Sequence, residues 1–171
     1  RRGLPLLAKG QSASHVMRTL VAEDEGRDFR QLAVMDRDGA TAGWTGRSNS
    51  DFKGHLEGDN VIVAGNILAG PEVLEAMAAA YQAATAQDSA QDLAGRLLAA
   101  LTAGQAAGGD SRGTRSAALL VDGGSGAALN LRIDYDEAPV AALAALHERS
   151  KDAVYRDFLK RLPDEQDPSR Y

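Results

Sequence analysis

The stretch Trp44–Met77, WTGRSNSDFKGHLEGDNVIVAGNILAGPEVLEAM, decides the fold. It begins with a polar, glycine-marked segment, Gly46–Gly58, which is typical of a loop. The β-branched run Asn60–Ala64 predicts a strand, which breaks at Gly65-Asn66. Pro71 then predicts the start of an amphipathic helix, because proline suits the first helical position. This order places polar side chains at the end of a strand, where rigid scaffolds often carry functional groups.

The rest of the chain alternates between helical and extended patterns. Apolar runs at 31–35 and 40–45 flank Asp36-Arg37-Asp38-Gly39, and Asp-Gly between such runs predicts a hairpin. A second strand pair is predicted at 116–121 and 129–134, with a turn at 122–126. Helical spacing of apolar residues predicts helices that begin near Ser12, Pro71, Asp92 and Pro139. Ser12 is the expected N-cap of the first, and Gly26 is expected to follow its end in a left-handed conformation.

The pattern therefore contains two hairpin-like strand pairs, one extra strand and four or five helices. Strands come in adjacent runs with helices between the runs, which favours an α+β fold over a regularly alternating one. A length of 171 residues fits one domain. We expect that domain to cover residues 1–162 and a polar tail to cover 163–171.

Composition and charge exclude several classes of function. The net charge is −5, with 19 Lys and Arg against 24 Asp and Glu, so a basic surface that could follow phosphates is not expected and nucleic acid is not a predicted partner. No apolar run is long enough to cross a bilayer, so no membrane partner is predicted. The sequence contains no cysteine, which excludes disulfides and thiolate chemistry. A cytoplasmic location is the default expectation, with a periplasmic or secreted location left open.

A second polar, glycine-rich segment, Gly104–Arg115, contains the first candidate site residues. Adjacent glycines before Asp110 let the backbone approach a ligand closely. Arg112 could bind a carboxylate with both arms of its guanidinium, and Asp110 could orient an amine or accept a proton. The alternative is a solvated loop in which Asp110 and Arg112 pair with each other or cap a turn.

Asn66 and His55 are the other candidates from residue type and position. Asn66 lies at the predicted turn from strand to helix, where an amide side chain could stabilise an oxyanion, or could simply suit the turn. His55 is the only histidine in the predicted loops, whereas His15 and His147 fall on predicted helices. One loop histidine without a partner at metal-ligand spacing does not predict a metal site, and no cofactor is expected.

Three blocks of the sequence resemble the DUF1028 family, a bacterial and archaeal family of undefined function placed among the N-terminal nucleophile (Ntn) hydrolases. The blocks are Gly65–Val73, Ala103–Asp110 with Arg112 and Ser116, and Leu131–Asp134. The resemblance extends from about Gly3 to His147. It implies a four-layer αββα sandwich and hydrolysis of an amide bond by an N-terminal Thr, Ser or Cys.

The resemblance also implies a strand-rich region ahead of the segment that matches Gly3-Leu4, and this region would supply the nucleophile. Arg1 cannot serve as one, so the sandwich is expected to be incomplete at its N-terminus. The positions that carry over are Asn66 as an oxyanion donor, Asp110 and Arg112 as groups that orient the substrate or the amine, and Thr45 with His55 as pocket lining.

Two main functions and one structural possibility follow. The first is hydrolysis of a small amide or lactam through a nucleophile that is not present in this sequence. The second is a binding module of the same fold that holds a small or cell-wall-associated ligand without turnover. The alanine-rich helices also suggest a homo-oligomer. For the first two, segments 46–58 and 104–115 should meet at one end of the sheets.

Overall fold

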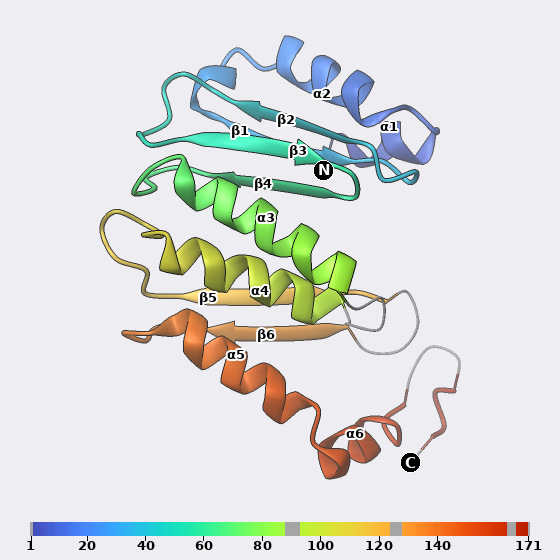
Figure 1. Cartoon of the computed structure of the whole chain (residues 1–171). Coiled ribbons are helices and arrows are strands. Elements are labelled where there is room, and N and C mark those ends of the chain that lie inside the picture. The colour runs from blue at the N-terminus through green and yellow to red at the C-terminus, as the bar shows by residue number, and fades with distance from the viewer. Residues whose placement is uncertain (1, 88–92, 124–127, 164–166, 171) are drawn as a thin grey trace.

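The computed structural model describes residues 2–87, 93–123, 128–163 and 167–170 (Figure 1). Part of the predicted 122–126 turn, the predicted helix start at Asp92 and part of the predicted tail lie outside these residues. The described elements are helices α1 (Leu4–Ala8), α2 (Ala13–Ala22), α3 (Glu72–Gln87), α4 (Leu93–Ala106), α5 (Pro139–Ser150) and α6 (Ala153–Leu159), a short 3-10 helix (Arg27–Phe29), and strands β1 (Gln31–Met35), β2 (Thr41–Thr45), β3 (Gly54–Gly58), β4 (Val61–Gly65), β5 (Ala117–Val121) and β6 (Leu129–Ile133).

The strands form three antiparallel hairpins, β1–β2, β3–β4 and β5–β6. The hairpin predicted around Asp36–Gly39 is confirmed, and so is the β5–β6 pair. The predicted loop Gly46–Gly58 is wrong in its second half, because residues 54–58 pair with β4 in register as strand β3. The single extra strand of the sequence pattern, β4, therefore has a hairpin partner in β3. Glycines at both ends of β3, Gly54 and Gly58, make its sequence look like a loop.

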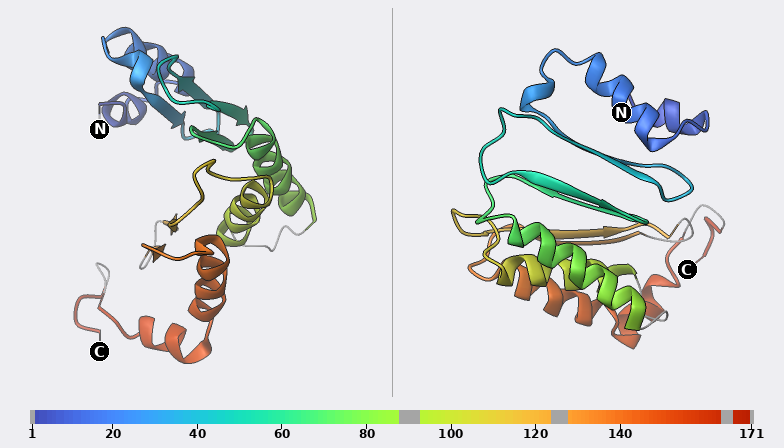
Figure 2. Two further views of the ribbon diagram at one scale, coloured as in Figure 1. Left: turned by 90° about the vertical axis from the view of Figure 1, so that its left-hand side faces the viewer. Right: turned by 45° about the horizontal axis from the view of Figure 1, so that its top comes forward.

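The α+β fold class is confirmed, and in the N-terminal half the layers follow the order helix, hairpin, hairpin, helix. Helix α2 packs on β1–β2, this hairpin contacts β3–β4, and α3 covers the other side of β3–β4. Figure 2 shows α3, α4 and α5 along one side of the molecule, with α1 and α2 on the far side of the first two hairpins. The β5–β6 hairpin packs against α4 and α5.

The second half of the molecule has its own core but only two layers within the described residues. Ala94 and Leu98 of α4, Leu119 of β5 and Leu143 of α5 form a buried cluster. The opposite face of the hairpin is exposed, and Leu120 keeps 65% of its surface accessible. A complete four-layer sandwich is therefore not shown by the described part of the chain.

The N-terminus of α2 is fixed by two side chains. Ser12 accepts a hydrogen bond from the His15 amide, which confirms the predicted N-cap. The Asp36 carboxylate accepts a bond from the Ala13 amide at 2.9 Å, and bonds from Asp38 and Ala40 inside its own turn. The Ala13 N–H is the main reason why the pKa of Asp36 lies below its ordinary value. The predicted left-handed conformation of Gly26 is wrong, because its φ is −86° and the residue precedes the 3-10 helix.

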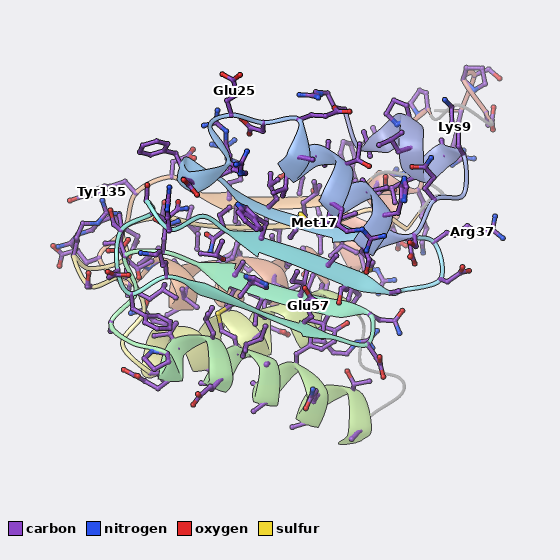
Figure 3. All side chains as sticks on the ribbon, turned by 90° about the horizontal axis from the view of Figure 1, so that it is seen from above. Lys9, Met17, Glu25, Arg37, Glu57 and Tyr135 are labelled. Atoms are coloured by element: carbon purple, nitrogen blue, oxygen red, sulfur yellow. The ribbon has the colours of Figure 1, made fainter. Side chains whose placement is uncertain are left out.

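The turns of the first two hairpins are in contact at the end of the molecule that Arg37 marks in Figure 3. Gly39 has a φ of +86°, and its carbonyl accepts a hydrogen bond from the Asn60 amide at 3.1 Å. A Cβ atom at Gly39 would collide with the carboxamide of Asn60. Only glycine permits both the backbone angle and this contact.

Gly39→Ala should therefore destabilise the fold by about 1–3 kcal/mol, from the backbone strain together with the collision. Gly10→Ala is the matched control, because Gly10 also has a positive φ of +78° but has no other atom within 4 Å of an added Cβ. Urea unfolding of both variants measures the difference. Equal losses of stability would show that the contact between the two turns contributes nothing.

Candidate functional site

The candidate site lies at the opposite end of the hairpins from their turns. Because the strands are antiparallel, the start of β1, the end of β2, the start of β3 and the end of β4 share this end of the molecule (Figure 1). These positions carry Gln31, Thr45, His55 and Asn66. Three of the predicted site residues are thus brought together by topology, and Gln31 lies between them.

Gln31 connects the two stacked hairpins. Its side-chain nitrogen Nε2 lies 2.9 Å from the carbonyl oxygen of Gly54 and 2.8 Å from that of Gly65. These two glycines are direct partners in the β3–β4 register, so one carboxamide holds the end of the neighbouring hairpin. The same nitrogen lies 3.1 Å from Thr45 Oγ1, within its own hairpin.

Asn66 is held by the other end of the same carboxamide. Its Nδ2 atom donates to Gln31 Oε1 at 3.1 Å, and the residue is otherwise exposed. This bond uses one of the two N–H groups of the Asn66 amide. The second N–H makes no hydrogen bond with the described residues, so it is available to an oxygen atom of a ligand.

His55 and Thr45 form a second polar pair beside Gln31. Thr45 Oγ1 lies 2.9 Å from His55 Nδ1, and the other ring nitrogen lies 3.8 Å from Glu57 Oε1. Gln31 Nε2 has two hydrogens for three oxygen neighbours and so shares them between Thr45 Oγ1 and the two carbonyls, which leaves the Thr45 hydroxyl proton able to point toward Nδ1. When Thr45 donates to Nδ1, the ring proton lies on Nε2, toward the carboxylate. Glu57 is fixed in turn by the Gly43 amide at 2.6 Å.

The position of the imidazole depends on Gly43 in β2. A Cβ atom added there would collide with His55 Cδ2 and would lie 2.7 Å from Nε2. The ring therefore lies against bare backbone of the adjacent hairpin. This contact explains why a glycine occupies the middle of a strand, where it otherwise weakens the structure.

A narrow backbone strip joins this cluster to the second glycine-rich segment. Residues 67–69 form its middle: Leu68 and Phe52 exchange hydrogen bonds at 3.0 and 3.3 Å, Ala69 N lies 3.0 Å from Gly109 O, and Ser111 N lies 2.8 Å from Ile67 O. Leu68 and Asp110 are bridge partners. Residues 67–69 therefore bond to both glycine-rich segments, which come to this end of the hairpins without a direct hydrogen bond to each other among the described residues.

Asp110 and Arg112 pair with each other, which is the arrangement of the alternative interpretation. Arg112 donates from Nε to Asp110 Oδ1 at 3.0 Å and from a terminal nitrogen to Oδ2 at 2.8 Å, and its backbone amide also donates to Oδ1 at 2.8 Å. These bonds lower the pKa of Asp110 from 3.8 to about 2. Such a carboxylate stays ionised near neutral pH and is a poor general base. No hydrogen bond joins this pair to Asn66 among the described residues.

The sequence pattern did not reveal two members of the cluster, Gln31 and Glu57. Gln31 begins an apolar strand, where a polar residue is ordinary, and Glu57 lies in the predicted loop Gly46–Gly58. His55 is correspondingly on strand β3 and not in a loop. The described residues contain no group of three or more His, Asp and Glu side chains that could hold a metal ion. No helix among them is long and apolar enough to cross a membrane.

Gly43→Ala should displace the imidazole and break its bond to Thr45. The His55 ring nitrogens should then lose their tautomer preference, which ¹⁵N NMR of the ring measures. Gly123→Ala is the control, since an added Cβ there meets no atom of the described residues within 4 Å. A ring spectrum unchanged in Gly43→Ala would contradict the contact between the hairpins.

The low pKa of Asp110 also predicts how the stability of the fold changes at acidic pH. A carboxyl whose pKa is depressed by folding stabilises the fold above its unfolded pKa, and this contribution disappears as the pH falls from about 4 toward about 2. Asp110→Asn should therefore be less stable than the parent near neutral pH, and the difference should shrink toward pH 2 in urea unfolding. Asp38→Asn, at a carboxylate that is 84% exposed, should show little difference at either pH. A difference for Asp110→Asn that did not change with pH would contradict the assignment.

Comparison with known proteins gives a family but no activity. The model of DUF1028, a family of unknown function, matches residues 1–143. A crystal structure of protein SPO2555 from Silicibacter pomeroyi, described with the same family, superposes with a TM-score of 0.81 at 35% sequence identity. The match covers 98% of this chain and 73% of that chain. No curated protein matches the sequence.

The two findings agree with the sequence blocks around Asn66 and Asp110, which fall inside the matched residues. The chain therefore belongs to the DUF1028 family, a family of unknown function.

Proposed function

We propose that this domain is the larger part of an amidohydrolase of the N-terminal nucleophile type, acting on a small amide or lactam. The nucleophile would come from a residue that is not in this sequence. The observation that carries the proposal is the meeting of the Asn66 amide and the Thr45–His55 pair around Gln31, next to the 67–69 strip. Family membership is consistent with it and does not itself give an activity.

Each group has a role that its geometry allows. The second N–H of Asn66 donates to the oxygen that becomes negative when an amide carbonyl is attacked. Thr45 and His55 lie beside Asn66 and bond polar atoms of the substrate. Asp110 orients a positively charged amine, because its low pKa keeps it ionised and unsuited to accept a proton. Arg112 releases its hydrogen bonds to Asp110 and binds a substrate carboxylate in its place.

A second function, binding without turnover, is favoured by the way in which the polar groups are already bonded within the protein. The Asp110–Arg112 pair is closed on itself, and Gln31 uses both its oxygen and its nitrogen inside the protein. Groups engaged in this way are held in place and supply no effective proton acceptor near neutral pH. The same fold could then hold a small ligand, including a fragment of cell-wall material, without cleaving it.

Chemical blocking of the α-amine in the full-length gene product separates the two functions. Mass spectrometry would measure hydrolysis of a panel of small amides and lactams before and after the block. The proposal expects turnover that disappears when the amine is blocked. Turnover that survives blocking would contradict the Ntn mechanism. Binding of panel members by ligand-observed NMR, with no product formed, would favour the binding module.

Asn66→Ala tests the oxyanion role on any substrate so found. Loss of one such donor typically lowers kcat by about 100- to 1000-fold, with a smaller effect on KM. Asn130→Ala is the matched control, because Asn130 is exposed on β6 outside the cluster. A kcat for Asn66→Ala equal to that of the control would remove Asn66 from the mechanism.

A further inference from the structure

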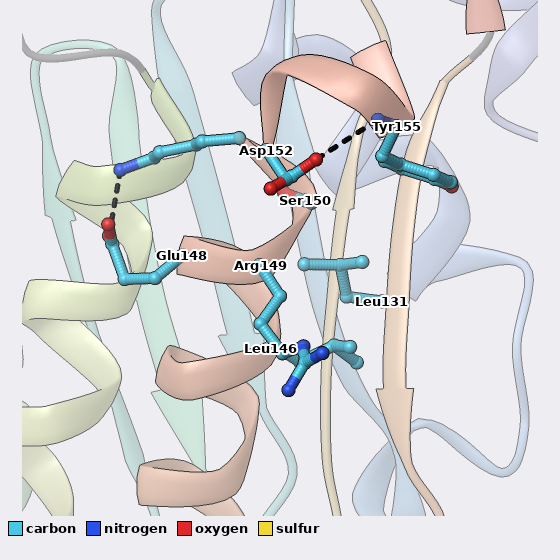
Figure 4. Close-up of a pocket in the computed structure, with 8 residues that line it drawn as sticks. Leu131, Leu146, Glu148, Arg149, Ser150, Asp152 and Tyr155 are labelled. Carbon is cyan, nitrogen blue, oxygen red and sulfur yellow. Dashed lines mark hydrogen bonds and ion pairs between the residues drawn. The ribbon is translucent and has the colours of Figure 1, made fainter. Parts of the chain in front are cut away.

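A pocket of about 950 Å³ lies where α5 ends and α6 begins, away from the candidate site (Figure 4). Its lining combines three apolar or aromatic side chains with polar and charged ones: Leu131, Leu146, Tyr155, Glu148, Arg149, Ser150, Lys151 and Asp152. The volume is in the range of pockets that bind small molecules. Except for Leu131, all of these residues follow the part of the chain that the family model matches.

Most of the polar groups that line this pocket are already engaged. Glu148 and Lys151 form an ion pair at 2.8 Å. Asp152 caps α6 by accepting bonds from the amides of Val154 and Tyr155, at 2.9 and 3.2 Å. The Ser150 hydroxyl donates to the carbonyl of His147 at 2.7 Å. These contacts form the rim of the pocket and are not available to a ligand without cost.

Arg149 is different, because its guanidinium has no hydrogen bond or ion pair with any described residue. Figure 4 shows this side chain extending beside Leu146, in a pocket that Leu131 also lines. The two carboxylates that line the pocket are both occupied, Glu148 by Lys151 and Asp152 by the α6 amides. Within the part of the chain that the structure describes, the charge left without a partner in the pocket is therefore positive.

We propose that this pocket binds a small anionic amphiphile, a carboxylate or sulfonate attached to an apolar body about the size of two or three fused or linked rings. The leucines and the Tyr155 ring cover the apolar body, since burying apolar surface is favourable. Arg149 binds the anionic head, because a guanidinium presents several donors in one plane. This site is independent of the proposed hydrolysis, and either could fail without affecting the other.

A matched pair of fluorescent probes tests both parts of the proposal. The first is 8-anilinonaphthalene-1-sulfonate, and the second is N-phenyl-1-naphthylamine, which has the same rings without the sulfonate. The parent protein should bind the sulfonate at one saturable site and more tightly than the neutral probe. Amide chemical-shift changes in NMR should map to Leu131 and residues 146–155.

Arg149→Gln should weaken the sulfonate several-fold and leave the neutral probe unchanged. Arg156→Gln is the charge-matched control on α6, outside the lining, and should bind both probes as the parent does. Tyr155→Ala should weaken both probes, and circular dichroism checks that each variant is folded. The proposal would be overturned if Arg149→Gln bound the sulfonate as tightly as the parent, or if Arg156→Gln lost as much sulfonate affinity as Arg149→Gln. Chemical-shift changes that mapped to other residues would also overturn it.

Discussion

The carboxamide of Gln31 is the interaction on which the site end of the molecule depends. It projects from the first hairpin and bonds the carbonyls of Gly54 and Gly65, two residues that face each other in the second hairpin. A hydrogen bond of this kind contributes about 0.5–1.5 kcal/mol, but losing it leaves partly buried groups unpaired at a cost of about 1–3 kcal/mol. Two short hairpins that share no strand ladder are thereby kept in one relative position.

The neighbours of Gln31 follow from that position. Thr45 and His55 can bond only because their strands belong to different hairpins that lie face to face, with Gly43 bare beneath the ring. Asn66 follows β4 directly and reaches the other end of the carboxamide. Contact between Gly39 and Asn60 at the far turns complements this arrangement. Fixing the hairpins at both ends presents one set of polar groups on a rigid frame, which suits a binding or catalytic site.

Local sequence signals predicted the local structure well. The Asp36–Gly39 turn, the Ser12 cap and the helix at Pro139 each depend on neighbouring residues, and all three are confirmed. Strand β3 was missed because its glycines and polar residues imitate a loop, and its pairing with β4 determines its conformation. Gln31 was missed because its partners are 14 to 35 residues away and the stacking of hairpins leaves no periodic signal. The mutual pairing of Asp110 and Arg112 was one of two open alternatives, which residue types alone could not separate.

NMR of the Gln31 side-chain amide tests the central interaction most directly. If this amide holds the second hairpin, its two protons should exchange slowly with solvent and show nuclear Overhauser contacts to the α-protons of Gly54 and Gly65. A rapidly exchanging amide with contacts only to residues of its own hairpin would contradict that role. Thr45, His55 and Asn66 would then share an end of the molecule without forming one site.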